Sequence, residues 1–232
     1  MFRWIVVLML AASPVLLSAK DAIWTNRNTP SGAQSIIKYY QDLYQTKGDY
    51  DSCWKYAEAL NYYAKNYLKK EDRKPYYEKA VKACEKAVQL KPKGPEGYLW
   101  YSVVFGRLTE MNMDPFGIPK LLDLANKLIE IDPSFADGAG YVIRAQLYQK
   151  APGWPISIGD QEKALADYHT AMKYGKNNKE LYWYYGEFLL EKGQKAVALK
   201  LIDKGLAIKP DPGDPDDAKI DKKLKALKEK CK

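Results

Sequence analysis

A spacing of aromatic, small and bulky residues recurs along most of this 232-residue chain. In its clearest copy, two aromatic residues three positions apart are followed directly by a small residue, and a second segment repeats small and bulky residues before a proline. The residues of this copy are Tyr182, Tyr185, Gly186, Leu189, Ala198, Ile202, Gly205 and Pro210. Small residues let two antiparallel helices approach closely, and bulky residues fill the space between neighbouring helix pairs. The spacing therefore predicts stacked helical hairpins.

Three further copies appear once insertions are allowed between the paired helices. Their residues are Cys53, Tyr56, Ala57, Leu60, Ala80, Cys84, Ala87 and Pro92; Tyr98, Tyr101, Ser102, Phe105, Leu121, Ala125, Leu128 and Pro133; and Tyr141, Arg144, Ala145, Tyr148, Ala164, Tyr168 and Ala171. The inserted turns are Lys69–Lys74, Asn112–Gly117 and Ala151–Asp160. This pattern is typical of tetratricopeptide repeats. We expect an all-α fold, a short tetratricopeptide-repeat α-solenoid of about four hairpins. A packing helix at 33–46 should precede the repeats. An acidic loop at 211–217 and a second packing helix at 218–230 should follow them.

The first 19 residues have the pattern of an export signal. Arg3 supplies a positive start, Trp4–Leu17 form an apolar run, and Ser18-Ala19 end it with small residues. The run is short for a bilayer span, and no cluster of stop-transfer charges follows it. We expect cleavage after Ala19, a linker over 20–32, a repeat domain over 33–232, and secretion across the inner membrane into the periplasm. The alternative is an uncleaved N-terminal anchor.

Composition and motifs argue against a catalytic or nucleic-acid-binding protein. The net charge is +8, but the lysines are scattered along helical stretches, which indicates a solvated basic surface. His169 is the only histidine, and no phosphate-binding glycine loop, nucleophile elbow or zinc-protease motif is present. Glu187 and Glu191 lie one helical turn apart, a spacing that is also common on repeat helices. We expect no catalytic residues, no metal and no cofactor.

The sequence does not decide whether Cys53 and Cys84 form a disulfide. Cys53 and Cys84 fall on the two helices of one hairpin, but their axial offset is roughly 7 Å, which is awkward for a disulfide. We expect each to pack as a small apolar residue and Cys231 to be free.

One stripe of each hairpin's first helix should face the inner curve of the solenoid. With two tryptophans and several aliphatic residues, this stripe suggests a groove for a partner or ligand with an apolar floor. The alternative is that the flanking N-terminal helix covers it. Its residues are Trp54, Glu58, Tyr62, Leu99, Val103, Arg107, Val142, Gln146, Lys150, Trp183, Glu187 and Leu190.

Arg144 occupies a position where the repeat pattern has a large apolar residue. Either its aliphatic stem packs while its head reaches solvent, or it pairs with a carboxylate between repeats. We expect the first arrangement.

The inserted segments resemble one known family. Stretch 95–110 (PEGYLWYSVVFGRLTE), with its Gly106-Arg107-Leu108, is followed by Asp132-Pro133, Asp137-Gly138, Leu147-Tyr148, the Pro152-Gly153-Trp154-Pro155 loop and Gly159-Asp160. Over roughly residues 35 to 230 the chain resembles the T-component family of tripartite ATP-independent periplasmic (TRAP) transporters. Two departures are the missing lipid-bearing cysteine near the N-terminus and Arg144 in an apolar position.

The resemblance implies a periplasmic repeat protein that docks a transporter's substrate-binding protein, can form trimers with a central pore, and helps to pass an apolar or organic-acid ligand. We therefore expect an adaptor that binds a periplasmic solute-binding protein through its concave face and the loop at 152–155. Alternatives are a carrier of a small apolar or organic-acid ligand and a generic scaffold in envelope assembly.

Overall fold

The computed structural model describes residues 22–209 and 216–232, and in that part of the chain all regular structure is helical. The helices, in chain order, are η2 (Ala22–Asn26), α1 (Pro30–Thr46), α2 (Tyr50–Tyr67), η3 (Lys70–Asp72), α3 (Lys74–Leu90), α4 (Pro95–Asn112), α5 (Gly117–Ile131), α6 (Phe135–Lys150), α7 (Gln161–Tyr174), α8 (Lys179–Glu191), α9 (Lys195–Leu206) and α10 (Asp217–Cys231). The predicted export signal at 1–19, Pro210 and most of the predicted acidic loop lie outside the described residues. Within the predicted linker, η2 is helical and α1 begins at Pro30, earlier than the helix predicted from residue 33.

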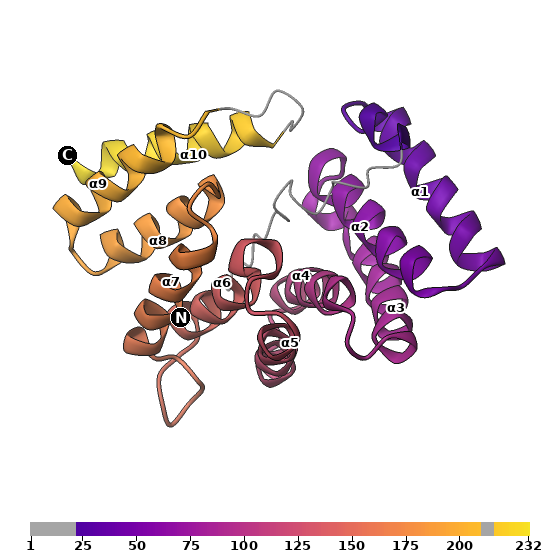
Figure 1. The fold of residues 1–232 in the computed structure, drawn as a ribbon, viewed down its shortest axis with the longest axis horizontal. Helices are drawn as coiled ribbons and strands as arrows, with labels where there is room; N and C mark the ends of the chain where they lie inside the picture. The colour runs from indigo at the N-terminus through magenta and orange to yellow at the C-terminus, as the bar shows by residue number, and fades with distance from the viewer. Residues whose placement is uncertain (1–21, 210–215) are drawn as a thin grey trace.

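Consecutive helices pack as hairpins that follow one another around an arc (Figure 1). The pairs are α2 with α3, α4 with α5, α6 with α7, and α8 with α9. At the two ends, α1 packs on α2, and α10 packs on α8 and α9. The predicted α-solenoid of four hairpins with packing helices at both ends is therefore confirmed.

Side-chain caps and prolines set where several helices begin. The carboxylate of Asp49 accepts a hydrogen bond from the backbone N–H of Ser52 at the start of α2, and Asp160 caps α7 in the same way. Asn178 caps α8, while α3 and α4 have a proline in their first turn. Each cap satisfies an amide that the helix cannot pair internally.

The small residues of the repeat pattern lie where helices approach most closely. Ala80 and Ala87 of α3 are fully buried, as the pattern predicts. Gly205 of α9 faces Tyr182 of α8, and a Cβ atom at Gly205 would lie 2.7 Å from the Tyr182 Cβ. That separation is shorter than carbon atoms tolerate, so only glycine allows these helices to pack at this distance.

Arg144 contradicts the expectation that its head reaches solvent. Its Nε lies 2.8 Å from Asp167 Oδ2 and its second terminal nitrogen 2.8 Å from Asp167 Oδ1, a bidentate ion pair. The remaining terminal nitrogen donates to Asn126 Oδ1 at 2.8 Å. The guanidinium thus joins α6 to both α5 and α7, because its five donors can serve a carboxylate and an amide together.

All three cysteines are buried and free. Burial raises the pKa of the Cys53 and Cys84 thiols, with the thiol of Cys84 well above its ordinary value. Neutral thiols in these positions pack as small apolar side chains.

Candidate functional site

The first helix of each hairpin lies on the inner side of the arc, and the second lies on the outer side (Figure 1). The predicted stripe therefore has the expected placement: its residues come from α2, α4, α6 and α8. The exposure of these side chains is uneven, and their use as a binding groove stays a prediction. Glu58, Leu99, Val103, Arg107, Val142 and Gln146 are buried, while Trp54, Tyr62, Lys150, Trp183, Glu187 and Leu190 are half-buried.

Segments at both ends of the chain cover parts of this stripe. The Trp24 ring of η2 packs edge-on against Tyr62, with ring centroids 5.9 Å apart. At the other end, Lys223 of α10 places its Nζ 3.9 Å from the centre of the Trp183 ring. These two aromatic residues are thus covered by η2, which lies within the predicted linker, and by α10, and not by the helix predicted at 33–46.

Several buried polar atoms on the inner side of the arc have no hydrogen-bond partner. They are both amide atoms of Gln146, Oδ1 of Asn61 and the hydroxyl of Tyr184, although Gln146 lies close enough to Tyr184 for a weak interaction that lowers the pKa of that hydroxyl. Gln146 is only 1% exposed. The sequence interpretation missed Asn61 and Tyr184, although Asn61 is three positions past Glu58 and so shares its helix face. These groups come from α2, α6 and α8.

Charged groups from four helices lie within electrostatic reach of the same region. Burial raises the pKa of Tyr184 well above its ordinary value, Glu180 raises it further, and the positive charge of Arg107 lowers it. Burial also lowers the pKa of Lys223, Glu180 opposes this shift, and Lys65 and Arg107 add to it. The inner region therefore combines cations, a carboxylate and uncharged hydrogen-bonding groups; we refer to Asn61, Arg107, Gln146, Glu180, Tyr184 and Lys223 as the inner polar cluster.

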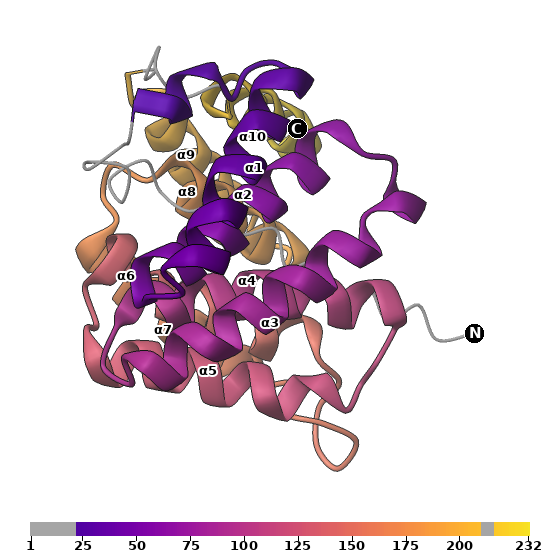
Figure 2. The ribbon, with the colours of Figure 1, turned by 90° about the vertical axis from the view of Figure 1, so that its right-hand side faces the viewer.

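The two ends of the arc meet. Lys65 of α2 lies 3.4 Å from Asp216, just before α10, and Lys219 donates to Asn66 Oδ1 at 2.7 Å. Although burial alone would raise the pKa of Asp216, the charges of Lys65 and Lys219 hold it below its ordinary value. On the other side, Lys179 of α8 lies 2.9 Å from Asp217. Figure 2 shows α10 beside the N-terminal helices at the same end of the molecule.

Glu187 and Glu191 of α8 belong to a network between helices. Lys150 Nζ lies 3.2 Å from Glu187 Oε2 and 2.6 Å from Glu191 Oε1. Glu191 also accepts from Gln149, whose own side-chain oxygen accepts from the buried Tyr168 hydroxyl at 2.6 Å. Because these carboxylates are held by a lysine and an amide, the pair joins α6, α7 and α8.

The loop predicted to bind a partner lies beside a second inserted turn. Met113 and Phe116 of the α4–α5 turn are 78% and 88% exposed, and Trp154 and Ile156 of the α6–α7 loop are 89% and 71% exposed. Between the loops lies a cavity of about 550 Å³ whose walls include Glu110, Phe116, Pro152 and Ile156. We call Met113, Phe116, Trp154 and Ile156 the paired-loop surface. Pro152, Gly153 and Pro155 complete the predicted loop motif, and Pro152 is half-buried while the others are exposed.

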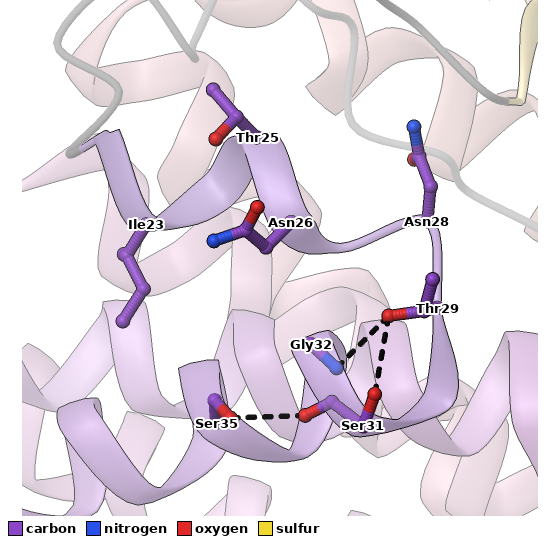
Figure 3. A pocket seen from close by; sticks show the side chains of 8 residues that line it. All are labelled: Ile23, Thr25, Asn26, Asn28, Thr29, Ser31, Gly32 and Ser35. Carbon is purple, nitrogen blue, oxygen red and sulfur yellow. Dashed lines mark hydrogen bonds between the residues drawn. The ribbon is translucent and has the colours of Figure 1, made fainter.

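A smaller pocket of about 420 Å³ lies between η2 and the start of α1 (Figure 3). Its hydroxyl groups serve the helix itself. Thr29 Oγ1 accepts from the Gly32 backbone N–H at 3.1 Å, and the Ser35 hydroxyl donates to the Ser31 carbonyl at 3.0 Å. The pocket is thus the capped beginning of α1.

Neither metal ligation nor a membrane-spanning helix is found in the described part of the chain. Among residues 22–209 and 216–232, no three His, Cys, Asp or Glu side chains are grouped so that they could hold a metal ion. The same residues contain no helix that is both long and apolar enough to cross a bilayer. His169 is exposed, and its ring lies edge-on to Tyr185 with centroids 5.6 Å apart.

Known structures resemble this chain over most of its length. The crystal structure of TTC0263, a thermophilic tetratricopeptide-repeat protein of Thermus thermophilus, is 18% identical, with a TM-score of 0.55, and the match covers 84% of this chain and 98% of that one. This chain folds as a tetratricopeptide-repeat solenoid. The crystal structure of MamA is also 18% identical, with a TM-score of 0.51, covering 80% of this chain and 93% of that one.

Comparison of sequences finds a match over a smaller part of the chain than comparison of structures does. A family model described as "Regulator of microtubule dynamics protein 1-3" matches residues 16–113, which is less than half of the chain. No curated protein matches. These likenesses concern the fold, and the resemblance to TRAP transporter T-components remains a prediction.

Proposed function

We propose that this protein is an exported, non-enzymatic adaptor whose inner polar cluster binds a partner protein. The observation that carries the proposal is the set of buried, unpartnered polar atoms on Asn61, Gln146 and Tyr184. Each buried polar group without a partner costs about 1–3 kcal/mol. A partner that supplied hydrogen bonds to these groups would recover that free energy on binding.

The chemistry of the cluster favours a polypeptide segment. The Gln146 amide offers both a donor and an acceptor, which matches the N–H and C=O groups of an extended backbone. Arg107 and Glu180 lie in the same region and can select acidic or basic side chains on that segment. Repeat solenoids bind partners on extended concave surfaces. In this chain η2 and α10 cover part of that face, so a partner's segment must displace them to reach the cluster.

We take the partner to be a periplasmic solute-binding protein of a TRAP-type transporter. Two sequence features support this choice: the export pattern at the N-terminus and the resemblance of the inserted segments to T-components. A trimeric assembly and a location in the periplasm belong to the same proposal.

The test is covalent capture from the periplasm of the source organism with the full-length gene product as bait. A crosslinked solute-binding protein is expected with the native chain. Gln146→Leu removes the unpartnered amide and should reduce this capture strongly, while Val197→Ala, on an exposed position of α9, should not. Capture that never yields a solute-binding protein, or that is unaffected by Gln146→Leu, would sink the proposal.

A second candidate is a carrier of a small organic-acid or apolar ligand. It is favoured by the contact between the two ends of the arc, because Lys65 and Asp216 bring α2 and α10 together around the inner side. Native mass spectrometry of the purified protein separates the candidates: a retained small-molecule mass that disappears in Gln146→Leu supports the carrier.

A further inference from the structure

Exposed apolar side chains are concentrated on two loops at one edge of the solenoid. The described residues contain eight large hydrophobic side chains that are exposed, and four of them form the paired-loop surface. The other four are scattered singly: Tyr39, Leu90, Tyr174 and Val197. Scattered apolar residues are normal on a protein surface, whereas a concentration on adjacent loops indicates something that covers them.

Part of the backbone of the longer loop is hydrogen-bonded within the loop itself. The N–H groups of Ile156 and Ser157 donate to the Gly153 carbonyl at 3.1 and 3.3 Å, and the N–H of Gly159 donates to the Pro152 carbonyl at 2.6 Å. Pro152 and Pro155 have no N–H to satisfy. In addition, residues 151–159 contain no charged side chain. Three of the loop's N–H groups are thus satisfied within the loop, and its other backbone polar groups would stay hydrated at the level of the lipid headgroups, where water is present.

A basic turn lies next to the apolar loops. The α2–α3 turn carries Lys69, Lys70, Arg73 and Lys74 against Glu71 and Asp72. Burial raises the pKa of Glu110, a wall residue of the cavity between the loops, while the charges of Lys70 and Arg73 lower it. The two cations are thus within electrostatic reach of the paired-loop surface. Cations beside an apolar tip complement a bilayer that contains anionic lipids.

We propose that the paired-loop surface inserts into the interfacial region of an anionic lipid bilayer, with the α2–α3 turn against the headgroups. Trp154 and Phe116 enter the boundary between headgroups and acyl chains, where aromatic rings are favoured. The cavity between the loops is lined by Phe116, Ile118, Ile156 and Ile158 together with the acidic side chains Glu110 and Asp114, so the acyl-chain contacts are assigned to the exposed tips and not to the cavity. The attachment goes beyond the adaptor function and holds the solenoid at the membrane without a covalent lipid.

A bilayer fits this surface better than a protein partner. Energetically dominant side chains in protein interfaces occupy well-packed pockets at the centre of a contact area. Here Phe116 and Trp154 project almost completely into solvent from separate loops. A fluid bilayer accepts projecting apolar side chains in any relative arrangement, whereas a protein partner would need a pocket for each.

Vesicle sedimentation tests the proposal with the full-length chain. The probes are vesicles of phosphatidylcholine alone and vesicles that also contain phosphatidylglycerol. We expect binding to the mixed vesicles, with the partition coefficient lowered about tenfold by Trp154→Ala, since burial of a large apolar side chain is lost. Charge reversal by Lys70→Glu changes the charge by two units and should lower it about 30-fold, at about 1 kcal/mol for each unit of charge near an anionic surface.

Leu90→Ala is the matched control, because Leu90 is an exposed apolar residue at the far end of α3 from the basic turn. All variants share the same N-terminal residues, so differences between them report on the loops. Vesicles of brominated lipid should also quench part of the native tryptophan emission, and Trp154→Phe should lose that part while still sedimenting.

Three results would overturn the proposal: equal partition of the native chain and Trp154→Ala, an equal loss in Leu90→Ala, or an absence of quenching that depends on Trp154. If Trp154→Ala instead abolishes crosslinking to the solute-binding protein while vesicle binding is unchanged, the surface docks a protein. The adaptor proposal is tested separately, by covalent capture of a solute-binding protein with the native chain and with Gln146→Leu, so its failure can be distinguished from failure of the membrane proposal.

Discussion

Replacing Gln146 with leucine should stabilise the protein. Both atoms of the Gln146 amide are buried on α6 without a hydrogen-bond partner. Folding removes this amide from water and gives it no well-formed hydrogen bond, only a weaker interaction with the Tyr184 hydroxyl. A buried polar group without a partner costs about 1–3 kcal/mol. Leucine is of similar size and carries no polar atom, so the substitution relieves that cost without opening a large cavity. We expect the free energy of unfolding to rise by about 1–3 kcal/mol.

The change is measurable by urea and thermal unfolding followed by circular dichroism. A gain of about 1 kcal/mol raises the midpoint temperature of a domain of this size by about 2–4 °C. Gln149→Leu provides the control on the same helix: Gln149 accepts from Tyr168 and donates to Glu191, both at hydrogen-bond distance. Leucine there leaves the buried Tyr168 hydroxyl without its acceptor and should destabilise the fold by about 1–3 kcal/mol.

The reasoning is refuted if Gln146→Leu destabilises the protein as much as Gln149→Leu. That result would mean that the Gln146 amide has a partner in solution, such as an ordered water. The inner polar cluster would then hold no unmet hydrogen bonds for a partner to satisfy. A stabilised variant that has lost partner capture would show instead that stability is sacrificed at this position for binding.

Three further substitutions test the architecture. Gly205→Ala should destabilise the last hairpin by about 1–3 kcal/mol because a Cβ atom would force α8 and α9 apart; an unchanged urea midpoint would contradict the close packing. Arg144→Met should lower the free energy of unfolding by about 3–5 kcal/mol, because it leaves the Asp167 carboxylate buried and unpaired. Adding Asp167→Leu should restore most of that loss. A double variant no more stable than Arg144→Met would contradict this account. The closure between Lys65 and Asp216 should respond to acid. Because the folded-state pKa of Asp216 is lowered, its stabilising contribution is present above the ordinary carboxyl pKa and disappears as the pH falls through the lowered value. The protection factor against amide hydrogen exchange at the start of α10, which removes the intrinsic pH dependence of exchange, should fall over that range in the native chain, whereas in Lys65→Ala it should be low already at neutral pH.

The hairpins were predictable from the sequence because local packing determines them. Small residues are needed at Ala80, Ala87 and Gly205 because helices that follow one another in the chain pack closely there. Their spacing in the sequence therefore predicts the hairpins. The capping residues Asp49 and Asn178 act over an even shorter range. These signals specify the elements and their order without reference to the rest of the molecule.

The state of the inner face was not predictable in the same way. Whether the stripe is open depends on the rotation accumulated over four hairpins, which decides whether the two ends of the arc meet. Lys65 and Asp216 are 151 positions apart, and no local spacing reports such a contact. The placement of α10 over Trp183 is different, because α10 packs on α8 and α9, its neighbours in the chain.

Arg144 illustrates a different limit. Its sequence position left two arrangements open, and the decisive partner, Asp167, lies on the next helix at a position that the repeat pattern leaves unspecified. The paired-loop surface has the same origin. The motif at 152–155 was recognised in the sequence, but the proximity of its loop to Phe116, seen in the cavity that Pro152 and Ile156 share with Phe116, depends on two insertions that project from the same edge.

The contact between the ends of the arc also affects how the protein unfolds. In an open repeat array each repeat contacts only its neighbours, so unfolding can begin at either end and advance stepwise. Here the ion pair between Lys65 and Asp216 and the hydrogen bond from Lys219 to Asn66 bind the two ends to each other. Fraying of α10 must break contacts with α2 as well as with α8 and α9, which couples the first hairpin to the last. The chain should therefore lose its structure in a single cooperative transition, with slower hydrogen exchange at its ends than an open solenoid of the same length would show.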